Sequence, residues 1–158
     1  MKLAPVLSLI LPVPYRENIQ VSIGWLHSPM IIWPGLYERF ILEYYRQKHT
    51  YLMEVKAGQV KWNLTGDDSE TMVRFLPVMQ TDIMLRLKEK ILIIDAKYYG
   101  RALQKQFDKY SLHSGNLYQI FTYVKNQDKD DTRDVAGILL YAKTDEDIAP
   151  DFMFNMGG

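Results

Sequence analysis

The stretch ILIIDAKYYG, residues 91–100, begins as a buried β-strand and ends in charged residues. Its aliphatic run is typical of a core strand, but charged side chains are almost never fully buried unless they are paired. Successive strand side chains point to opposite faces, so Asp95 and Lys97 lie on the face that also carries Ile93. Two interpretations remain open: a structural ion pair between Asp95 and Lys97, or a site that serves something outside the protein.

A second carboxylate is expected opposite Asp95. Two adjacent strands joined by a turn at Lys88 and Glu89 would place Asp82 directly across from Asp95. Opposed residues lie about 4.5–5.5 Å apart at Cβ, and like charges in this position destabilise a sheet. Mutual repulsion therefore predicts a raised pKa for at least one of the two aspartates in the metal-free protein.

Two opposed carboxylates favour a cation between them. Hard oxygen ligands suit Mg²⁺ or Mn²⁺. Such a metal can polarise a phosphoryl oxygen and lower the pKa of bound water. Lys97, on the face of Asp95, could orient that water or offset the negative charge of a transition state.

Other polar residues stand where they could join this site. Glu38 shares a helical face with apolar residues and so points inward or into a cleft, although such a residue is more often a partly covered surface position. Gln119 and Tyr123 lie one turn apart on one helical face, where a polar margin of a packed helix is the ordinary explanation. His113 precedes that helix and could contact a phosphate or cap a turn.

Hydrophobic periodicity predicts an alternation of helices and strands. The expected elements, in chain order, are a helix at 35–49, an extended segment at 51–64 with a turn at Ala57–Gly58, strands at 71–87 and 90–99, a helix at 115–127 and a strand at 135–143. In the first of these strands, Pro77 indicates a bulge or an edge. The order predicts an α/β domain with a central mixed β-sheet flanked by helices.

The composition is that of an ordinary folded domain. The 158 residues, 47% of them hydrophobic and 24% charged, can bury the core of one domain. Basic and acidic residues balance at 19 each, so any nucleic-acid-binding surface must be local. The absence of cysteine excludes disulfides, thiol nucleophiles and Cys-ligated zinc. It also suits a reducing cytoplasm, and no apolar run approaches the roughly 18 residues of a membrane span.

Together these motifs resemble the PD-(D/E)XK nucleases. The pair TD at 81–82, followed by DAK at 95–97, resembles their signature, with Thr81 where a proline usually stands. QIFTY at 119–123 resembles the Q-x-x-x-Y helix of the RecB-like branch. Five blocks resemble the nuclease part of the McrC family of 5-methylcytosine-specific restriction subunits: LYERFILEYY, LPVMQTDIMLR, ILIIDAKYY, HSGNLYQIFTYV and GILLYAKTDED.

The resemblance implies a Mg²⁺-dependent DNA endonuclease with a restriction-endonuclease-like PD-(D/E)XK core. Carried over by position, the metal ligands are Asp82, Asp95 and, through its carbonyl, Ala96. The catalytic residues are these two aspartates together with Lys97 and Glu38. Gln119, Tyr123 and His113 are accessory residues close to DNA. Mn²⁺ is the expected substitute metal.

The same resemblance implies a domain organisation and a partner. The nuclease domain would span residues 35–147 and would be followed by a tail at 148–158. The N-terminal segment at 1–34 is expected to be either a β-rich start or the stub of a longer chain. The partner would be the AAA+ motor McrB acting on cytosine-methylated DNA. GTP would enter only through that motor, because this chain has no G-x-x-x-x-G-K-[ST] phosphate loop.

Two alternative functions stay open at this point. McrC-like proteins carry a larger N-terminal region that engages the motor, so this chain could be a non-catalytic assembly module with a nuclease-like fold. It could also be a RecB-like repair or recombination nuclease that acts on DNA ends.

Overall fold

The computed structural model describes residues 5–11, 29–64, 73–98, 103–106, 109–132, 134–142, 151 and 153–155. In chain order, the elements are β1 (Pro5–Leu11), α1 (Pro29–Lys48), β2 (Glu54–Val60), β3 (Met79–Leu87), β4 (Lys90–Lys97), β5 (Leu103–Gln106), β6 (Lys109–Leu112), α3 (Ser114–Gln127), β7 (Val135–Ala142) and β8 (Met153–Asn155).

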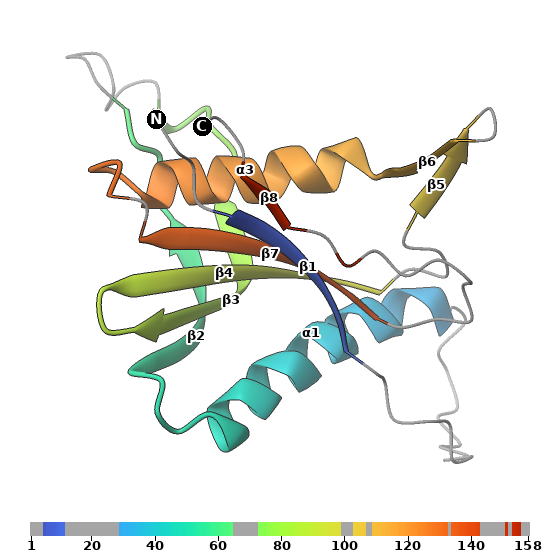
Figure 1. Cartoon of the computed structure of the whole chain (residues 1–158), viewed down its shortest axis with the longest axis horizontal. Helices are drawn as coiled ribbons and strands as arrows, with labels where there is room; N and C mark the ends of the chain where they lie inside the picture. The colour runs from blue at the N-terminus through green and yellow to red at the C-terminus, as the bar shows by residue number, and fades with distance from the viewer. Residues whose placement is uncertain are drawn as a thin grey trace.

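A mixed sheet of six strands forms the centre of the molecule, in the order β2-β3-β4-β7-β1-β8. The neighbours β2, β3 and β4 run antiparallel, whereas β4 and β1 each lie parallel to β7. Helix α3 packs on one face of the sheet and α1 on the opposite face (Figure 1). The predicted α/β class with a mixed central sheet is confirmed, and the arrangement is consistent with a restriction-endonuclease-like core.

Each face of the sheet has its own apolar core. Ile93 packs with Ile120 of α3, while its neighbour Ile94 packs with Ile41 of α1. Both β4 side chains are fully buried. They enter opposite cores because strand side chains alternate, so one strand supplies both layers. The face of Ile93 is the one on which Asp95 and Lys97 were expected.

Gly137 of β7 lets α3 approach the sheet closely. A Cβ at this position would lie 2.6 Å from Ile120 Cγ1 and 2.9 Å from Val124 Cγ2. Both distances are well below an ordinary van der Waals contact, so a larger residue would push the helix away from the sheet. Since α3 also carries Gln119, this packing fixes the height of that residue above β4.

The hairpin between β3 and β4 has the predicted register. Its ladder runs from Leu87–Lys90 to Ile83–Ile94. The turn uses Lys88 in the left-handed conformation, with a φ of 53°. This conformation is uncommon for a residue with a side chain, but it is what a two-residue hairpin turn requires.

A bulge in β3 ends this regular pairing at the level of Asp82. The register against β2 shifts between Lys56 and Gly58, so that two β3 residues, Asp82 and Ile83, lie opposite Ala57 alone. A bulge bends the strand and changes the direction of a side chain. The prediction that Asp82 and Asp95 form the next ladder pair is therefore wrong in detail, because the β3–β4 ladder stops one pair earlier.

Two further expectations about β2 and β3 were wrong. No turn occurs at Ala57–Gly58, because β2 continues through this point and the register shift absorbs the irregularity. β3 begins at Met79 rather than at residue 71. The segment before it forms a turn in which Leu76 N donates to Val73 O at 3.0 Å, and Pro77 has no N–H to offer a ladder.

Helix α1 is longer than expected, since it begins at Pro29 and includes Pro34. Pro34 removes one helical hydrogen bond, but its fixed φ is compatible with a helix. The helix at 114–127 and the strand at 135–142 agree with their predicted ranges within one residue.

Residues on both sides of 35–147 contribute strands to the sheet. β1 lies beside β7, and β8 pairs antiparallel with β1 (Figure 1). The expected domain end at residue 147 lies outside the described residues. No helix within the described ranges is long and apolar enough to cross a membrane.

Candidate active site

Asp95 and Lys97 lie at the end of β4, beneath α3. Asp95 is 1% exposed, and Lys97 Nζ lies 2.8 Å from Asp95 Oδ2. The ion pair that the sequence left open is therefore present. The paired Oδ2 of Asp95 is itself fully buried. The cost of taking two charges out of water can exceed the gain from pairing them, so the ion pair with Lys97 alone does not explain why Asp95 is buried.

Burial dominates the protonation of Asp95. It raises the pKa of this carboxyl to about 6, while the Lys97 ammonium acts in the opposite direction and the repulsion from Asp82 adds a smaller increase. The predicted direction of the shift thus holds, but desolvation rather than the neighbouring aspartate is its main cause.

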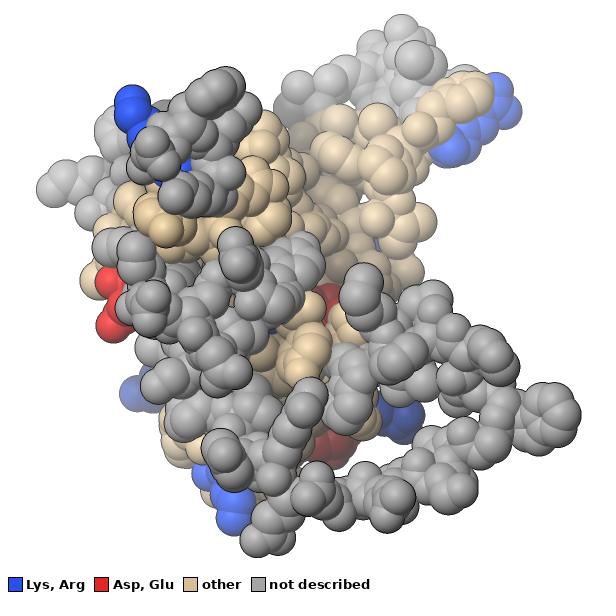
Figure 2. Space-filling model, turned by 90° about the vertical axis from the view of Figure 1, so that its right-hand side faces the viewer, with Lys and Arg blue, Asp and Glu red and all other residues tan. Residues whose placement is uncertain are grey.

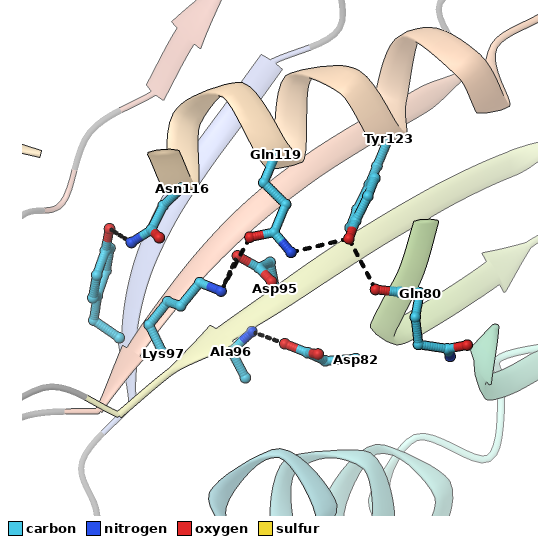
Figure 3. Close-up of polar contacts among 9 residues, drawn as sticks. Gln80, Asp82, Asp95, Ala96, Lys97, Asn116, Gln119 and Tyr123 are labelled. Carbon is cyan, nitrogen blue, oxygen red and sulfur yellow. Dashed lines mark hydrogen bonds and ion pairs between the residues drawn. The ribbon is translucent and has the colours of Figure 1, made fainter. Parts of the chain in front are cut away.

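Asp82 reaches the site from the bulge in β3. Its Oδ2 accepts a 2.7 Å hydrogen bond from the backbone N–H of Ala96, where a regular ladder would have used a β3 carbonyl (Figure 3). Burial raises the pKa of Asp82, whereas the Ala96 N–H and Lys97 lower it. The two carboxyl groups can share a proton through a side-chain hydrogen bond, so they lie next to each other without forming a ladder pair.

Thr81 occupies the position where the resembling nucleases usually carry proline, and its hydroxyl has a local task. Thr81 Oγ1 donates to the carbonyl of Gly58 at 2.9 Å and accepts from its N–H at 3.2 Å. The side chain is almost fully buried. It satisfies the backbone of β2 where the register shifts, and in this way it holds the bulge that directs Asp82.

A chain of hydrogen bonds links Lys97 to α3. Lys97 Nζ donates to Gln119 Oε1 at 3.4 Å, and Gln119 Nε2 donates to Tyr123 Oη at 2.9 Å. Tyr123 Oη in turn donates to the carbonyl of Gln80 at 3.0 Å (Figure 3). The structure therefore brings Gln119 into contact with the lysine, while Tyr123 contacts Gln119 and connects it to β3.

A second polar pair beside Lys97 was missed by the sequence reasoning. Asn116 Nδ2 of α3 donates to Tyr141 Oη at 3.3 Å, and both residues are buried. Tyr141 is the β7 residue paired with Lys97 in the sheet. Asn116 stands three residues before Gln119, and this spacing on one helical face was the available signal. Tyr141 gave none, because it lies within an apolar strand.

Glu38 and His113 occupy different places relative to this centre. Glu38 of α1 is partly buried, and its pKa is raised first by burial and then by repulsion from Asp82, while Lys97 lowers it. It therefore belongs to the same electrostatic group. His113 instead lies at the start of α3, where its ring accepts from Gln104 Nε2, and its side chain does not cap the helix.

The side of the molecule toward which β4 runs is hollowed. Figure 2 shows this side, on which small groups of acidic and basic atoms are visible.

Comparison with known proteins identifies the family. Residues 26–142 match the family of McrBC 5-methylcytosine restriction system components. This match covers most of the chain and includes all the site residues described above. The chain belongs to this family.

A curated relative supports the same assignment. The type IV methyl-directed restriction enzyme EcoKMcrBC of Escherichia coli (strain K12) is 31% identical over 120 residues, which are 76% of this chain. The aligned region covers 34% of the relative, so this McrBC-family chain spans about a third of that protein's length.

The donor set of this McrBC-family protein suits a divalent cation. Asp82 and Asp95 present adjacent carboxylates, and the ammonium of Lys97 is the cation that lies beside them among the described residues. The described residues contain no group of three or more His, Asp or Glu close enough to hold a metal. Mg²⁺ does not need one, because it is usually bound by one or two carboxylates, waters and substrate phosphates. The residues therefore fit this ion.

Proposed function

We propose that this McrBC-family chain is a metal-dependent DNA endonuclease of the PD-(D/E)XK type. It would supply the nuclease activity of a modification-dependent, 5-methylcytosine restriction system. One observation carries the proposal: a carboxylate that is 1% exposed, with its pKa raised to about 6, sits at the end of a core strand beside a lysine and a second carboxylate. Desolvated titratable groups that converge in this way are typical of catalytic centres.

Asp82 and Asp95 would hold Mg²⁺, or Mn²⁺ in its place. When bound, the ion would polarise the scissile phosphate and activate a water molecule. The Ala96 N–H fixes the orientation of Asp82, and this contact supports its role as a ligand. The Ala96 carbonyl stays a predicted additional ligand.

Lys97 would act on the reacting atoms directly. Its ammonium lies between Asp95 and Gln119, so it is held in place by acceptors on two sides. In this position it can donate a hydrogen bond to the attacking water or to a phosphate oxygen as negative charge develops there. Gln119 and Tyr123 would be positioning residues, since they touch Lys97 and β3.

Glu38 and His113 are proposed in supporting roles. Glu38, on the α1 side, adds negative charge near Asp82 and could accept a proton or bind a water of the metal. His113 is partly buried at the start of α3 and would lie near DNA.

The substrate and partner are proposed from the family. The family description refers to 5-methylcytosine restriction, and the name of the Escherichia coli relative refers to methyl-directed restriction. We propose cytosine-methylated DNA in the cytoplasm as the substrate, and an McrB-like AAA+ GTPase as the partner that hydrolyses GTP. Residues 35–147 would be the nuclease domain within such an assembly.

Plasmid nicking with Mg²⁺ or Mn²⁺ tests the nuclease proposal. Asp95→Ala is expected to lose more than about 10²-fold in rate, because loss of a ligand should exceed the 10- to 100-fold typical of a residue that only supports one. Asp131→Ala is the matched control, since this aspartate is exposed beyond the end of α3. Circular dichroism would confirm that both variants fold.

The results separate the alternatives. A folded Asp95→Ala variant that cuts like wild type would overturn the assignment of this site. Wild-type protein that never cuts, with or without an McrB-like motor, would favour the assembly module. Cutting of linear ends but not of closed circles would favour a repair nuclease.

A further inference from the structure

A two-stranded ribbon projects from the site side of the molecule. β5 and β6 form a separate antiparallel sheet that is not part of the central one. Figure 1 shows it extending beyond the start of α3, away from both cores. An isolated two-stranded hairpin is marginally stable in water, so its retention as a projecting element needs an explanation.

The base of the ribbon is fixed to the body of the protein. Leu112 packs against the core on the α3 face. Gln104 of β5 contacts His113, directly before α3. These contacts anchor the end nearest the sheet, while the exposed residues Lys109 and Tyr110 lie at the start of β6, toward the far end.

The ribbon is locally basic in a chain of zero net charge. Its eight strand residues include Lys105 and Lys109 and no carboxylate, and the sequence between the strands adds Asp108, so residues 103–112 carry a net charge of +1. Tyr110, the ladder partner of Lys105, is 55% exposed. Lysines and an exposed aromatic residue on one short ribbon are the composition of surfaces that contact phosphates, sugars and bases.

The ribbon is also connected directly to the two elements that carry the site. It is inserted between Lys97, the last residue of β4, and α3, whose Gln119 accepts a hydrogen bond from that lysine. Both ends of the insertion therefore start from elements that carry the site. A ligand bound by the ribbon would therefore lie on the same side of the molecule as the site.

We propose that the β5–β6 ribbon is an arm that binds duplex DNA next to the scissile phosphate, with Lys105 and Lys109 on phosphates and Tyr110 on the sugar or base edge. Strands of four residues span about 13 Å. The major groove, about 12 Å wide and 8.5 Å deep, admits a two-stranded ribbon. The proposal rests on DNA being the substrate of the proposed nuclease, but it does not require that the site cuts.

Fluorescence anisotropy with a labelled DNA duplex in EDTA tests the arm without cleavage, using the full 158-residue chain. Each lysine that binds a phosphate contributes about one to the slope of log K against log salt concentration. The double variant Lys105→Ala/Lys109→Ala should therefore bind more weakly and reduce this slope by about two. Tyr110→Ala should weaken binding and leave the slope unchanged.

The matched control is Lys61→Ala/Lys129→Ala. Both lysines are exposed and lie near the opposite end of α3, where Asn63 N bonds Asn126 Oδ1. This control should keep wild-type affinity and slope. Equal effects of the two double variants, or wild-type binding by the ribbon variant, would overturn the proposal that the ribbon binds DNA.

Cleavage assays distinguish this proposal from the nuclease proposal. If DNA binding depends on the ribbon but the protein never nicks DNA with Mg²⁺, the nuclease proposal is contradicted and the DNA-binding arm is supported. If the protein nicks DNA equally well with and without the ribbon lysines, the arm is contradicted and the nuclease proposal is supported. Wild-type protein without measurable DNA binding at low salt would also overturn the arm.

Discussion

The two halves of β4 differ in their neighbours. From Ile91 to Ile94 the strand is hydrogen-bonded to β3 on one side and to β7 on the other. From Asp95 to Lys97 the ladder continues only with β7. The first half is core, and the second half is the candidate site. One strand can serve both purposes because the bulge at Asp82–Ile83 releases β3 and leaves room for a carboxylate between the strands.

The comparison also explains the buried charges. In the first half, apolar side chains fill both cores at no electrostatic cost. In the second half, Asp95 and Lys97 take the same strand face, and their partners come from other elements: Gln119 from α3 and Asp82 from β3. The site is therefore a place where the sheet gives up regular pairing and replaces it with side-chain contacts.

The largest expected difference between the two halves of β4 is in DNA cleavage. Lys97→Ala should lower DNA cleavage by roughly 10²- to 10³-fold, because it removes a donor aimed at developing charge. Lys90→Ala, at the exposed start of the same strand, should cut like wild type. Single-turnover nicking of supercoiled plasmid would measure both. Equal rates for the two variants would contradict a catalytic role of the second half of β4.

The proposed metal should stabilise the protein only when both carboxylates, Asp82 and Asp95, are present. At about 100 times the Kd, Mg²⁺ should add roughly 2.7 kcal/mol to the free energy of unfolding, or a few degrees in Tm. Asp95→Asn should gain little, since it loses one of the two carboxylates. Thermal melts with Mg²⁺ and with EDTA would show this. A variant that gains as much as wild type would exclude Asp95 as a ligand.

Without metal, Asp95→Asn should make the protein more stable than wild type at neutral pH. Burial raises the pKa of Asp95 from 3.8 to about 6, so between these pH values the folded protein binds more protons than the unfolded chain. The free energy of unfolding of wild type should therefore fall as the pH rises from about 4 to about 6, by on the order of 2 kcal/mol. Asp95→Asn lacks this titration and should melt higher than wild type at pH 7–8 in EDTA.

Urea unfolding of both proteins across this pH range gives the comparison directly. If the variant melts lower at pH 8, the ion pair with Lys97 stabilises the fold more than the buried charge destabilises it. The second half of β4 would then be structural, as the first half is.

Much of this arrangement could be predicted from sequence because it depends on local periodicity. The alternation along β4 placed Asp95 and Lys97 on one face, and helical spacing placed Gln119 beside Tyr123. The hairpin register followed from a two-residue turn, even though Lys88 and Glu89 are unusual turn residues.

The rest depended on contacts between elements. The bulge at Asp82 arises from the fit of β3 against β2, where Thr81 binds Gly58, and no periodicity marks it. The Gln80 carbonyl that receives Tyr123 is a backbone group, which a sequence pattern cannot single out. Asn116 and Tyr141 meet only because β7 lies beside β4 under α3. The register of a parallel pair is set by packing rather than by a turn.

The smallest expected effect concerns the hydrogen bonds that hold Lys97 in place. Tyr123→Phe removes an acceptor from Gln119 Nε2 and a donor to the Gln80 carbonyl, while the ring still fills the core. Each lost hydrogen bond costs about 0.5–1.5 kcal/mol, so a modest fall in Tm is expected. Tyr118→Phe is the matched control, because Tyr118 lies on the same helix and is 70% exposed. If Gln119 orients Lys97, the Tyr123 variant should also cut about tenfold more slowly, with an unchanged gain in Tm from Mg²⁺, since neither carboxylate is altered. A purely structural Tyr123 would lower Tm and leave the cleavage rate at a temperature well below the transition unaffected. The combination of rate and metal-dependent Tm therefore shows whether the second half of β4 is organised from α3 or only covered by it.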